Sequence, residues 1–288
     1  MNLSDFSPRP ADIEQILRQV AAHAADEVLP ESVRHCLFII GFPRSGNSFL
    51  GQLINAHRQA LIANEGRVFA LLEKYPERNL LFRYLLTLDA KLGNRNYQKL
   101  ARLGGTRHEH VDQNLFFEKG HQGKNDNLLL IGNSKAAGLT HYLFEHGDFL
   151  KDFTNTFSLG LKIVLLVRHP ASMIKSYHKR TGATLEEALH YYRVTAGKLQ
   201  SILDSGKLPA EPYFVCYENF MADLDGSCSG LMNYLGLPCG PPELEIFRSN
   251  RKLDAPLDAR IVIDDSLQAR IAELIGEHGF FEPYRSNP

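Results

Sequence analysis

The chain has 288 residues, of which 44 % are hydrophobic and 23 % charged, and its formal net charge at pH 7 is −1. This length allows one large domain or two small ones, and buries about three quarters of the surface of the unfolded chain. The balanced charge excludes a surface that coats polyanions, so we do not expect nucleic acid as a partner.

The four cysteines form no CxxC pair, which argues against a zinc knuckle and against a disulfide framework. The start of the sequence, MNLSDFSPRP, lacks the basic and apolar parts of a signal peptide. No apolar run approaches the ~20 residues that span a bilayer. We therefore expect a cytoplasmic protein without a transmembrane segment.

Residues 11–29 place apolar side chains on one helical face between two prolines, which predicts an amphipathic helix before the first strand. The next stretch, residues 36–54, reads as a buried strand, a loop with two glycines and a helix. Gly41 and Gly46 permit tight backbone turns, and the amides of residues 45–48 would point at one centre at the start of the helix. Strand, glycine-rich loop and helix together predict a cradle for an anion, with phosphate as the default ligand.

This loop almost fits the phosphate-binding pattern G-x-x-x-x-G-K-[ST], but Asn47 stands where the lysine is required. Nucleoside triphosphatases use that lysine on the β- and γ-phosphates, so a neutral amide argues against triphosphate hydrolysis. A cation is present three residues earlier, at Arg44.

The run at 60–66 has strand character and ends at Glu65 and Gly66. Residues 67–92 are predicted to be helical. From 93 to 127 the composition changes to Gly, Asn, Lys, Arg and His, with more basic than acidic residues. We interpret 93–127 either as a mobile segment on the substrate side, a candidate lid, or as a solvated excursion. We see no linker that divides the chain, so residues 1–288 are expected to form a single domain.

Three further apolar runs predict buried strands at 128–132, 162–167 and 212–220. The first two run into Lys135 and Arg168, and the last ends at Tyr217 and Glu218. Strands that alternate with helices predict an α/β fold with three layers (α/β/α) and a parallel sheet of about five strands, similar to P-loop NTPases. Because ligands gather at the carboxyl ends of such strands, Glu65 would project there.

Arg168 and Ser176 are eight residues apart, with Pro170 between them at a predicted helix start. A guanidinium at a strand end can bind phosphate through two hydrogen bonds, and a serine about two helical turns later can donate a third.

Three segments resemble motifs of sulfotransferases that use PAPS (3′-phosphoadenosine 5′-phosphosulfate), and the resemblance covers about residues 36–240. PRSGNS at 43–48 resembles the P-[KR]-S-G-[TN]-[TS] loop, and VRHPASMIKSYHKR resembles R-[ND]-P-x-[DS]-x-x-x-S. YENFMADLDGSCSGLMNYLGLP resembles the late Y-E-[DN]-[LF] segment of the same family. The resemblance implies transfer of a sulfuryl group from PAPS to a hydroxyl or amine, with release of PAP (adenosine 3′,5′-bisphosphate).

The resemblance also implies roles for individual residues. The loop at 36–66 would hold the 5′-phosphosulfate, and the element at 162–180 would hold the 3′-phosphate. Tyr217 would lie near the nucleotide, against adenine. The alternative interpretation is that Tyr217 is simply a core residue. The residues expected to bind the donor are Arg44, Ser45, Gly46, Asn47, Ser48, Arg168, Ser176, Tyr217 and, by a looser match, Arg251 and Lys252.

The expected catalytic residues are Glu65, Arg44 and Lys135. Glu65 resembles the catalytic glutamate of several sulfotransferases, and Lys135 resembles a lysine that lies between donor and acceptor. A carboxylate near apolar walls can accept the proton of the acceptor hydroxyl. A histidine is the rival base, with His108, His110 and His121 in the polar segment. Positioned cations and amides can stabilise sulfuryl transfer without Mg²⁺, so no metal is expected.

Two other functions stay open from the sequence: a divergent P-loop kinase and a nucleotide-binding protein without chemistry. The acceptor is also open, since small-molecule, lipid and carbohydrate acceptors all fit. The sequence does not indicate the oligomeric state.

Overall fold

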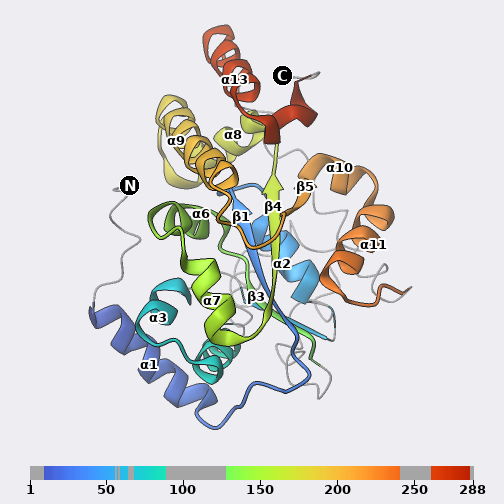
Figure 1. Cartoon of the computed structure of the whole chain (residues 1–288). Helices are drawn as coiled ribbons and strands as arrows, with labels where there is room; N and C mark the ends of the chain where they lie inside the picture. The colour runs from blue at the N-terminus through green and yellow to red at the C-terminus, as the bar shows by residue number, and fades with distance from the viewer. Residues whose placement is uncertain are drawn as a thin grey trace, which may run out of the picture.

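The fold is that of a computed structural model, which describes residues 10–55, 57, 59–63, 68–88, 128–240 and 261–285. Its centre is a five-stranded sheet in which every neighbouring pair is parallel (Figure 1). The strand order is β2-β3-β1-β4-β5, with β1 between β3 and β4. The strands are β1 (His35–Gly41), β2 (Ala60–Ala63), β3 (Leu130–Asn133), β4 (Gly160–Val167) and β5 (Tyr213–Cys216).

Side chains alternate between two buried clusters, one on each face of this sheet. In β1, Cys36, Phe38 and Ile40 belong to one cluster, whereas Leu37 and Ile39 belong to the other. Successive side chains of a strand point to opposite faces, so a strand that is apolar throughout is buried on both. The sheet is therefore the middle of three layers, which confirms the predicted α/β/α architecture.

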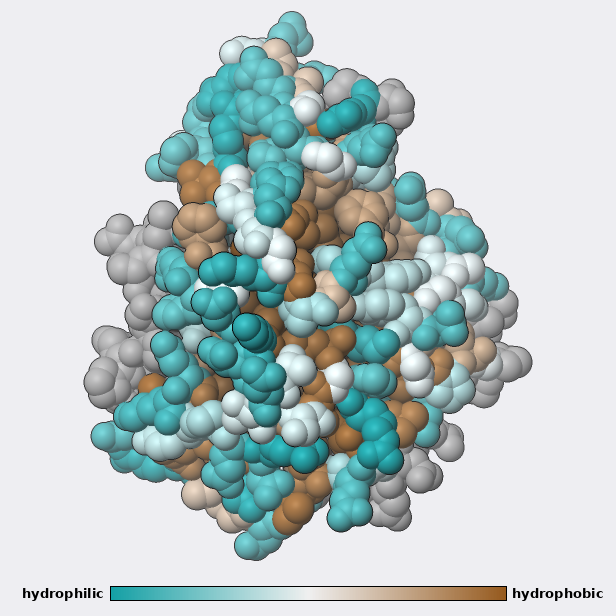
Figure 2. Space-filling model, viewed as in Figure 1, coloured by the Kyte–Doolittle hydropathy of each residue, from teal (hydrophilic) through white to brown (hydrophobic). Residues whose placement is uncertain are grey.

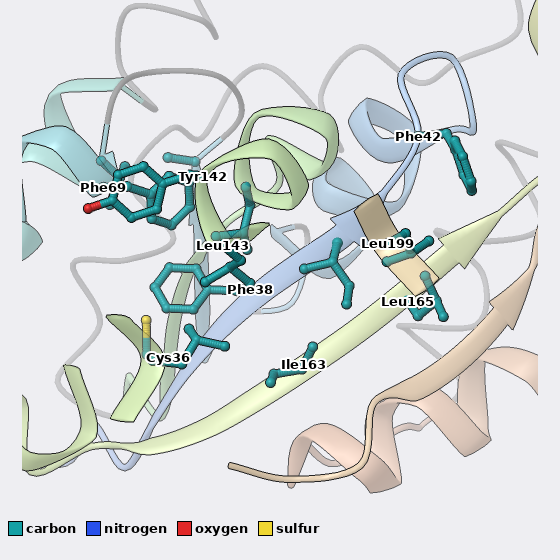
Figure 3. Close-up of a cluster of buried hydrophobic side chains, with 14 of the residues drawn as sticks. Cys36, Phe38, Phe42, Phe69, Tyr142, Leu143, Ile163, Leu165 and Leu199 are labelled. Atoms are coloured by element: carbon teal, nitrogen blue, oxygen red, sulfur yellow. The ribbon is translucent and has the colours of Figure 1, made fainter. Parts of the chain in front are cut away.

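The larger cluster lies between the sheet and a layer of helices that precede β1, follow β2, β3 and β4, or come late in the chain after β5. Figure 3 shows Phe38 of β1 beside Phe69 and Tyr142, and the Phe38 and Phe69 ring centroids are 5.3 Å apart. The helices of this layer are α1 (Pro10–Ala24), α3 (Val68–Lys74), α6 (Ala136–Glu145), α7 (Phe149–Phe157), α8 (Pro170–Thr181), α9 (Leu185–Asp204) and α13 (Asp265–Glu277).

The smaller cluster lies under the helices of the opposite face. These are α2 (Asn47–Asn55), α10 (Tyr217–Ala222) and α11 (Leu224–Leu235). A 3₁₀ helix, η4 (Gly279–Tyr284), follows α13 and lies near the tips of β4 and β5 in Figure 1. On the face viewed in Figure 2, hydrophilic residues dominate and hydrophobic ones gather in a central band.

The predicted helix at 67–92 is wrong in one respect. Residues 68–74 and 78–88 are helical, but residues 75–77 are not. Pro76 explains the break, because proline lacks an amide donor and disfavours a helical conformation of the residue before it. No helix among the described residues is both long enough and apolar enough to cross a membrane.

Because the strands are parallel, their carboxyl ends lie along one edge of the sheet. The loop after β1, the residues Ser134 and Lys135 after β3, and Arg168 after β4 all begin at this edge. In doubly wound sheets this edge is where ligands bind. The segments that carry these predicted site residues therefore all leave the sheet at the same edge.

Candidate functional site

The loop between β1 and α2 turns through three residues with positive φ: Gly41 (135°), Arg44 (64°) and Gly46 (104°). A Cβ atom at Gly41 would lie 2.3 Å from the carbonyl oxygen of Leu166, so only glycine fits against β4 here. At Gly46 a Cβ would lie 2.7 Å from two ring carbons of Tyr217. Both glycines therefore have the conformational role that the sequence predicts.

Polar side chains of the loop brace it from within. The Asn47 side-chain amide donates to the carbonyl of Phe42 at 2.8 Å, and the Ser45 hydroxyl lies 2.8 Å from the same oxygen. Ser45 is fully buried. Asn47 occupies the position of the missing lysine, and its side chain points back to the loop backbone. Leu50 N donates to Gly46 O at 2.9 Å, which is the first hydrogen bond of the α2 helix. The amides that precede Leu50 are at the helix start, where no carbonyl of the helix itself can accept from them.

Two hydroxyl groups from the covering helices fix the loop from outside. The Thr140 hydroxyl accepts from Gly41 N and lies close to Gly41 O, at 3.0 Å in each case. The buried Tyr192 hydroxyl lies 2.8 Å from the carbonyl of Pro43 and 3.2 Å from that of Met173 in α8. Burial raises the pKa of Tyr192 well above its usual value, so this hydroxyl stays protonated and can donate.

Arg44 and Ser176 meet across the site. Arg44 Nε donates a hydrogen bond of 3.1 Å to the Ser176 hydroxyl, which is on α8. The two residues come from separate predicted motifs, one in the loop and one after β4. The structure therefore joins these motifs in one place.

Arg168 lies beside the aromatic ring of Tyr217 and the carboxylate of Glu218. Its guanidinium carbon is 4.7 Å from the Tyr217 ring centroid, within the range of a cation–π contact. Its Nε atom is 3.9 Å from Glu218 Oε1, and no described residue forms a hydrogen bond with this buried atom. The Arg168 side chain is 22 % exposed, so its guanidinium can still receive an anion.

Tyr217 packs beneath the loop. Only 8 % of the residue is exposed, because Gly46, Arg168 and Phe49 surround its ring. The role near adenine that the sequence suggests for Tyr217 stays a prediction. The geometry itself places the ring as a support between the loop and Arg168.

Lys135 is at the amino-terminal end of α6. A Cβ atom at Gly138 would lie 3.1 Å from three side-chain carbons of Lys135, so this side chain lies along the first turn of the helix. The backbone amide of Lys135 donates a hydrogen bond of 3.1 Å to Asn133 Oδ1. Ser134 beside it is buried.

Arg44, Lys135 and Arg168 belong to the lining of a cleft of about 440 Å³, a size typical of ligand sites. Four of the residues that line it are cationic, Arg44, Lys135, Arg168 and Arg180, and none of the described lining residues is Asp or Glu. The other lining residues are Pro43, Gly46, Asn47, Ser48, Phe49, Ser134, Ala136, Ala137, Gly138, Tyr177, Thr181 and Tyr191. The arrangement is chemically suited to an anion with several charges.

The lining residues that sequence reasoning missed include Phe49, Tyr177, Arg180 and Tyr191. Arg180 could have been found, because it is four residues after Ser176 and therefore on the same helical face. Tyr177 and Tyr191 stack with ring centroids 5.1 Å apart, a contact between two helices without a local sequence signal. Burial raises the pKa of Tyr191 to about 12. Burial also raises the pKa of Tyr177 above its usual value, so both are neutral hydroxyls rather than bases at neutral pH.

Several predicted residues lie outside the described residues. They are Glu65, Arg251, Lys252, the three histidines His108, His110 and His121, and the segment 93–127. Within the described part of the chain, no group of three or more His, Cys, Asp or Glu residues could hold a metal ion.

Comparisons with known proteins give a family and several structures of similar fold. The profile of the sulfotransferase family matches residues 37–241. The sulfotransferase domain of an olefin synthase from Synechococcus PCC 7002 has a TM-score of 0.47 and 18 % identity, over 86 % of this chain and 94 % of that one. The sulfotransferase domain from the curacin biosynthetic pathway has a TM-score of 0.47 and 16 % identity, over 85 % and 97 %.

A sulfotransferase from Mycobacterium tuberculosis H37Rv has a TM-score of 0.45 and 13 % identity, over 91 % of this chain and 81 % of that one. Comparison with curated proteins gives no match.

Proposed function

The chain belongs to the sulfotransferase family, and on this premise we propose that it transfers a sulfuryl group from PAPS to an acceptor and releases PAP. The observation that carries the proposal is the contact of 3.1 Å between Arg44 and Ser176. One residue comes from the motif assigned to the 5′-phosphosulfate, and the other from the motif assigned to the 3′-phosphate. A donor with a charged group at each end suits a cleft that Arg44 lines and that Ser176 borders through its contact with Arg44.

We assign the 5′-phosphosulfate to Arg44 and to the amides of residues 45–48. This loop is held by Thr140, Tyr192 and Asn47, so its amides are oriented before a ligand binds. Donors that are fixed in advance stabilise charge that develops during a reaction, because they need not reorganise. In this proposal Ser45 and Asn47 act through their backbone amides, since their side chains brace the loop.

We assign the 3′-phosphate to Arg168 and Ser176. Arg180, which lines the cleft, is one helical turn beyond Ser176 on the same helical face. The Tyr217 ring supports Arg168 from one side. The ring of Phe49 lines the cleft and offers an aromatic surface for the adenine base. Arg251 and Lys252 stay as further candidates for the 3′-phosphate.

In the transfer step, the acceptor oxygen or nitrogen forms a bond with sulfur while the bond from sulfur to the 5′-phosphate oxygen breaks. The acceptor proton passes to a base, for which we propose Glu65. The Lys135 ammonium lines the cleft beside the loop and would stabilise the negative charge on the transferred group. We propose that these cations and amides stabilise the developing charge, which is the role that Mg²⁺ has in phosphoryl transfer.

A direct test supplies radiolabelled PAPS to the full chain together with a panel of phenols, alcohols, carbohydrates and amines. The proposal expects label on at least one acceptor and PAP in equal amount. Absence of transfer across the panel, combined with no affinity for PAP, would contradict it.

A further inference from the structure

Tyr284 of η4 is more than 60 positions from α10 in the sequence, and its hydroxyl touches the α10 residue that faces Arg168. The Tyr284 hydroxyl donates to Glu218 Oε2 at 2.5 Å and lies 3.1 Å from the sulfur of Cys216. Its ring packs edge-on against His169, with centroids 5.2 Å apart. Tyr284 is buried. The end of the described chain therefore reaches the carboxyl ends of β4 and β5.

The two oxygens of Glu218 face different partners. Oε2 accepts from Tyr284, whereas Oε1 accepts from the backbone amide of His169 at 3.1 Å. Oε1 is also 3.9 Å from Arg168 Nε, which is too long for a hydrogen bond. One carboxylate thus joins η4 to the turn that carries Arg168.

Hydrogen bonds at both oxygens keep this carboxylate from turning to form a close two-pronged pair with Arg168. Such a pair would occupy the guanidinium donors and neutralise the charge that an anion needs. At 3.9 Å the carboxylate still attracts and orients the guanidinium. Burial and the neighbouring Glu218 raise the pKa of Tyr284, so its hydroxyl keeps the proton that it donates.

We propose that Tyr284 and Glu218 are positioning residues for Arg168. Tyr284 holds the Glu218 carboxylate at a distance that orients the guanidinium but leaves its donors for the ligand. The inference rests on the proposed function, in which Arg168 binds the 3′-phosphate of the donor. It makes the C-terminal element η4 part of donor recognition, although Tyr284 does not line the cleft.

The test replaces the hydroxyl alone, with Tyr284→Phe in the full chain, and keeps the ring that packs on His169. Calorimetry measures the affinity for PAP and for AMP, which lacks the 3′-phosphate. We expect the Kd for PAP to rise about three- to tenfold, the equivalent of one hydrogen bond, while the Kd for AMP changes less than about twofold.

Tyr234→Phe is the matched control, because it also removes a tyrosine hydroxyl that is bound to β4. The Tyr234 hydroxyl contacts Ile163 N and O at 2.9 and 3.0 Å, and Tyr234 does not line the cleft. We expect this variant to lose stability without a change in the ratio of PAP to AMP affinity. A purely structural role of Tyr284 would make the two variants behave alike.

Glu218→Gln provides a second route to the same test. It should lower the preference for PAP, and Tyr284→Phe in that background should add less than about a twofold effect, because both changes interrupt one chain of contacts. An unchanged preference in both single variants, or fully additive effects, would overturn the inference.

The wild-type chain separates this inference from the proposed function. Equal affinity of the wild type for PAP and AMP would overturn both. A wild-type preference for PAP that Tyr284→Phe retains in full would leave the function in place and overturn the positioning role alone.

Discussion

Arg44 Nε and the Ser176 hydroxyl are hydrogen-bonded at 3.1 Å although 132 positions separate them in the sequence. Arg44 is in the loop after β1 and Ser176 is in α8 after β4, and β1 and β4 are neighbours in the sheet. Adjacent parallel strands deliver their following segments to the same edge, so this contact follows from the topology. It places the two predicted halves of a donor site against each other.

Arg168→Gln should weaken binding of PAP by about 10- to 100-fold, since a charge-assisted contact to a phosphate is lost. AMP should be affected much less, because it has no 3′-phosphate. Calorimetry with both nucleotides measures the difference. Arg34→Gln is the control, because Arg34 is exposed at the other end of β1 and should leave both affinities unchanged. Loss of PAP and AMP binding in equal measure would contradict the assignment of Arg168.

Glu65→Gln should leave PAP affinity within about twofold of the wild type and lower the rate of transfer about 10²- to 10⁴-fold, the range for loss of a general base. The rate is measured with any acceptor that the wild type sulfates. Turnover that stays at the level of the wild type would remove Glu65 as the base and return attention to the histidines of residues 93–127.

Gly41→Ala should destabilise the fold by ~2–4 kcal/mol or prevent folding, because the new Cβ would collide with the Leu166 carbonyl. Gly197→Ala in α9 is the matched control, since a Cβ there would meet no atom within 4 Å. That change should stabilise the protein by roughly 0.5–1 kcal/mol. Thermal unfolding compares the two variants, and equal melting temperatures would speak against the close approach of β1 and β4 at this point.

Thr140→Val should cost about 1–3 kcal/mol of stability, because it keeps the shape of the side chain but leaves the buried Gly41 amide without its acceptor. Thr154→Val removes only a hydrogen bond to Leu150 O within α7 and should cost less than about 0.5 kcal/mol. Chemical denaturation gives both values. If the Thr140 variant were as stable as the Thr154 variant, Thr140 would not be the support of the loop.

His141 should make stability depend on pH. Burial, followed by the nearby Lys198 charge, lowers the pKa of His141 from 6.5 to about 4, so the folded state favours the neutral ring. The unfolded chain binds the proton more readily, and the stabilisation is complete above the unfolded pKa and is lost as the pH falls from 6.5 towards 4. The loss is on the order of 2–3 kcal/mol.

His141→Asn should flatten this dependence in denaturation curves recorded between about pH 7 and pH 4. The Tyr191 hydroxyl, 3.4 Å from His141 Nε2, stays neutral over this range and adds no charge. A variant that loses as much stability as the wild type on acidification would show that other groups carry the effect.

Much of the fold could be predicted from the sequence, because parallel strands that are buried on both faces appear as short, continuous apolar runs. Arg44, Lys135 and Arg168 each follow such a run, so the shared edge of a parallel sheet was enough to bring them to one cleft. The break at Pro76 was also readable from the known effect of proline on helices.

Other features depend on contacts between distant segments and leave no periodic signal. Tyr192 supports Pro43 and Tyr284 holds Glu218, yet neither tyrosine belongs to a motif that the sequence analysis identified. Asn47 was predicted as a donor-binding residue without a role for its side chain, which braces the loop by binding Phe42 O. Such hydrogen bonds are decided by the path of the whole chain, so one sequence could not reveal them.

The most direct test of the account is a calorimetric titration of the full chain with PAP, AMP, and ATP with Mg²⁺. We expect PAP to bind at least about tenfold more tightly than AMP, because Arg168 and Ser176 contact the 3′-phosphate in the proposed complex. Equal affinity for PAP and AMP, or preferential binding of ATP with Mg²⁺, would contradict it.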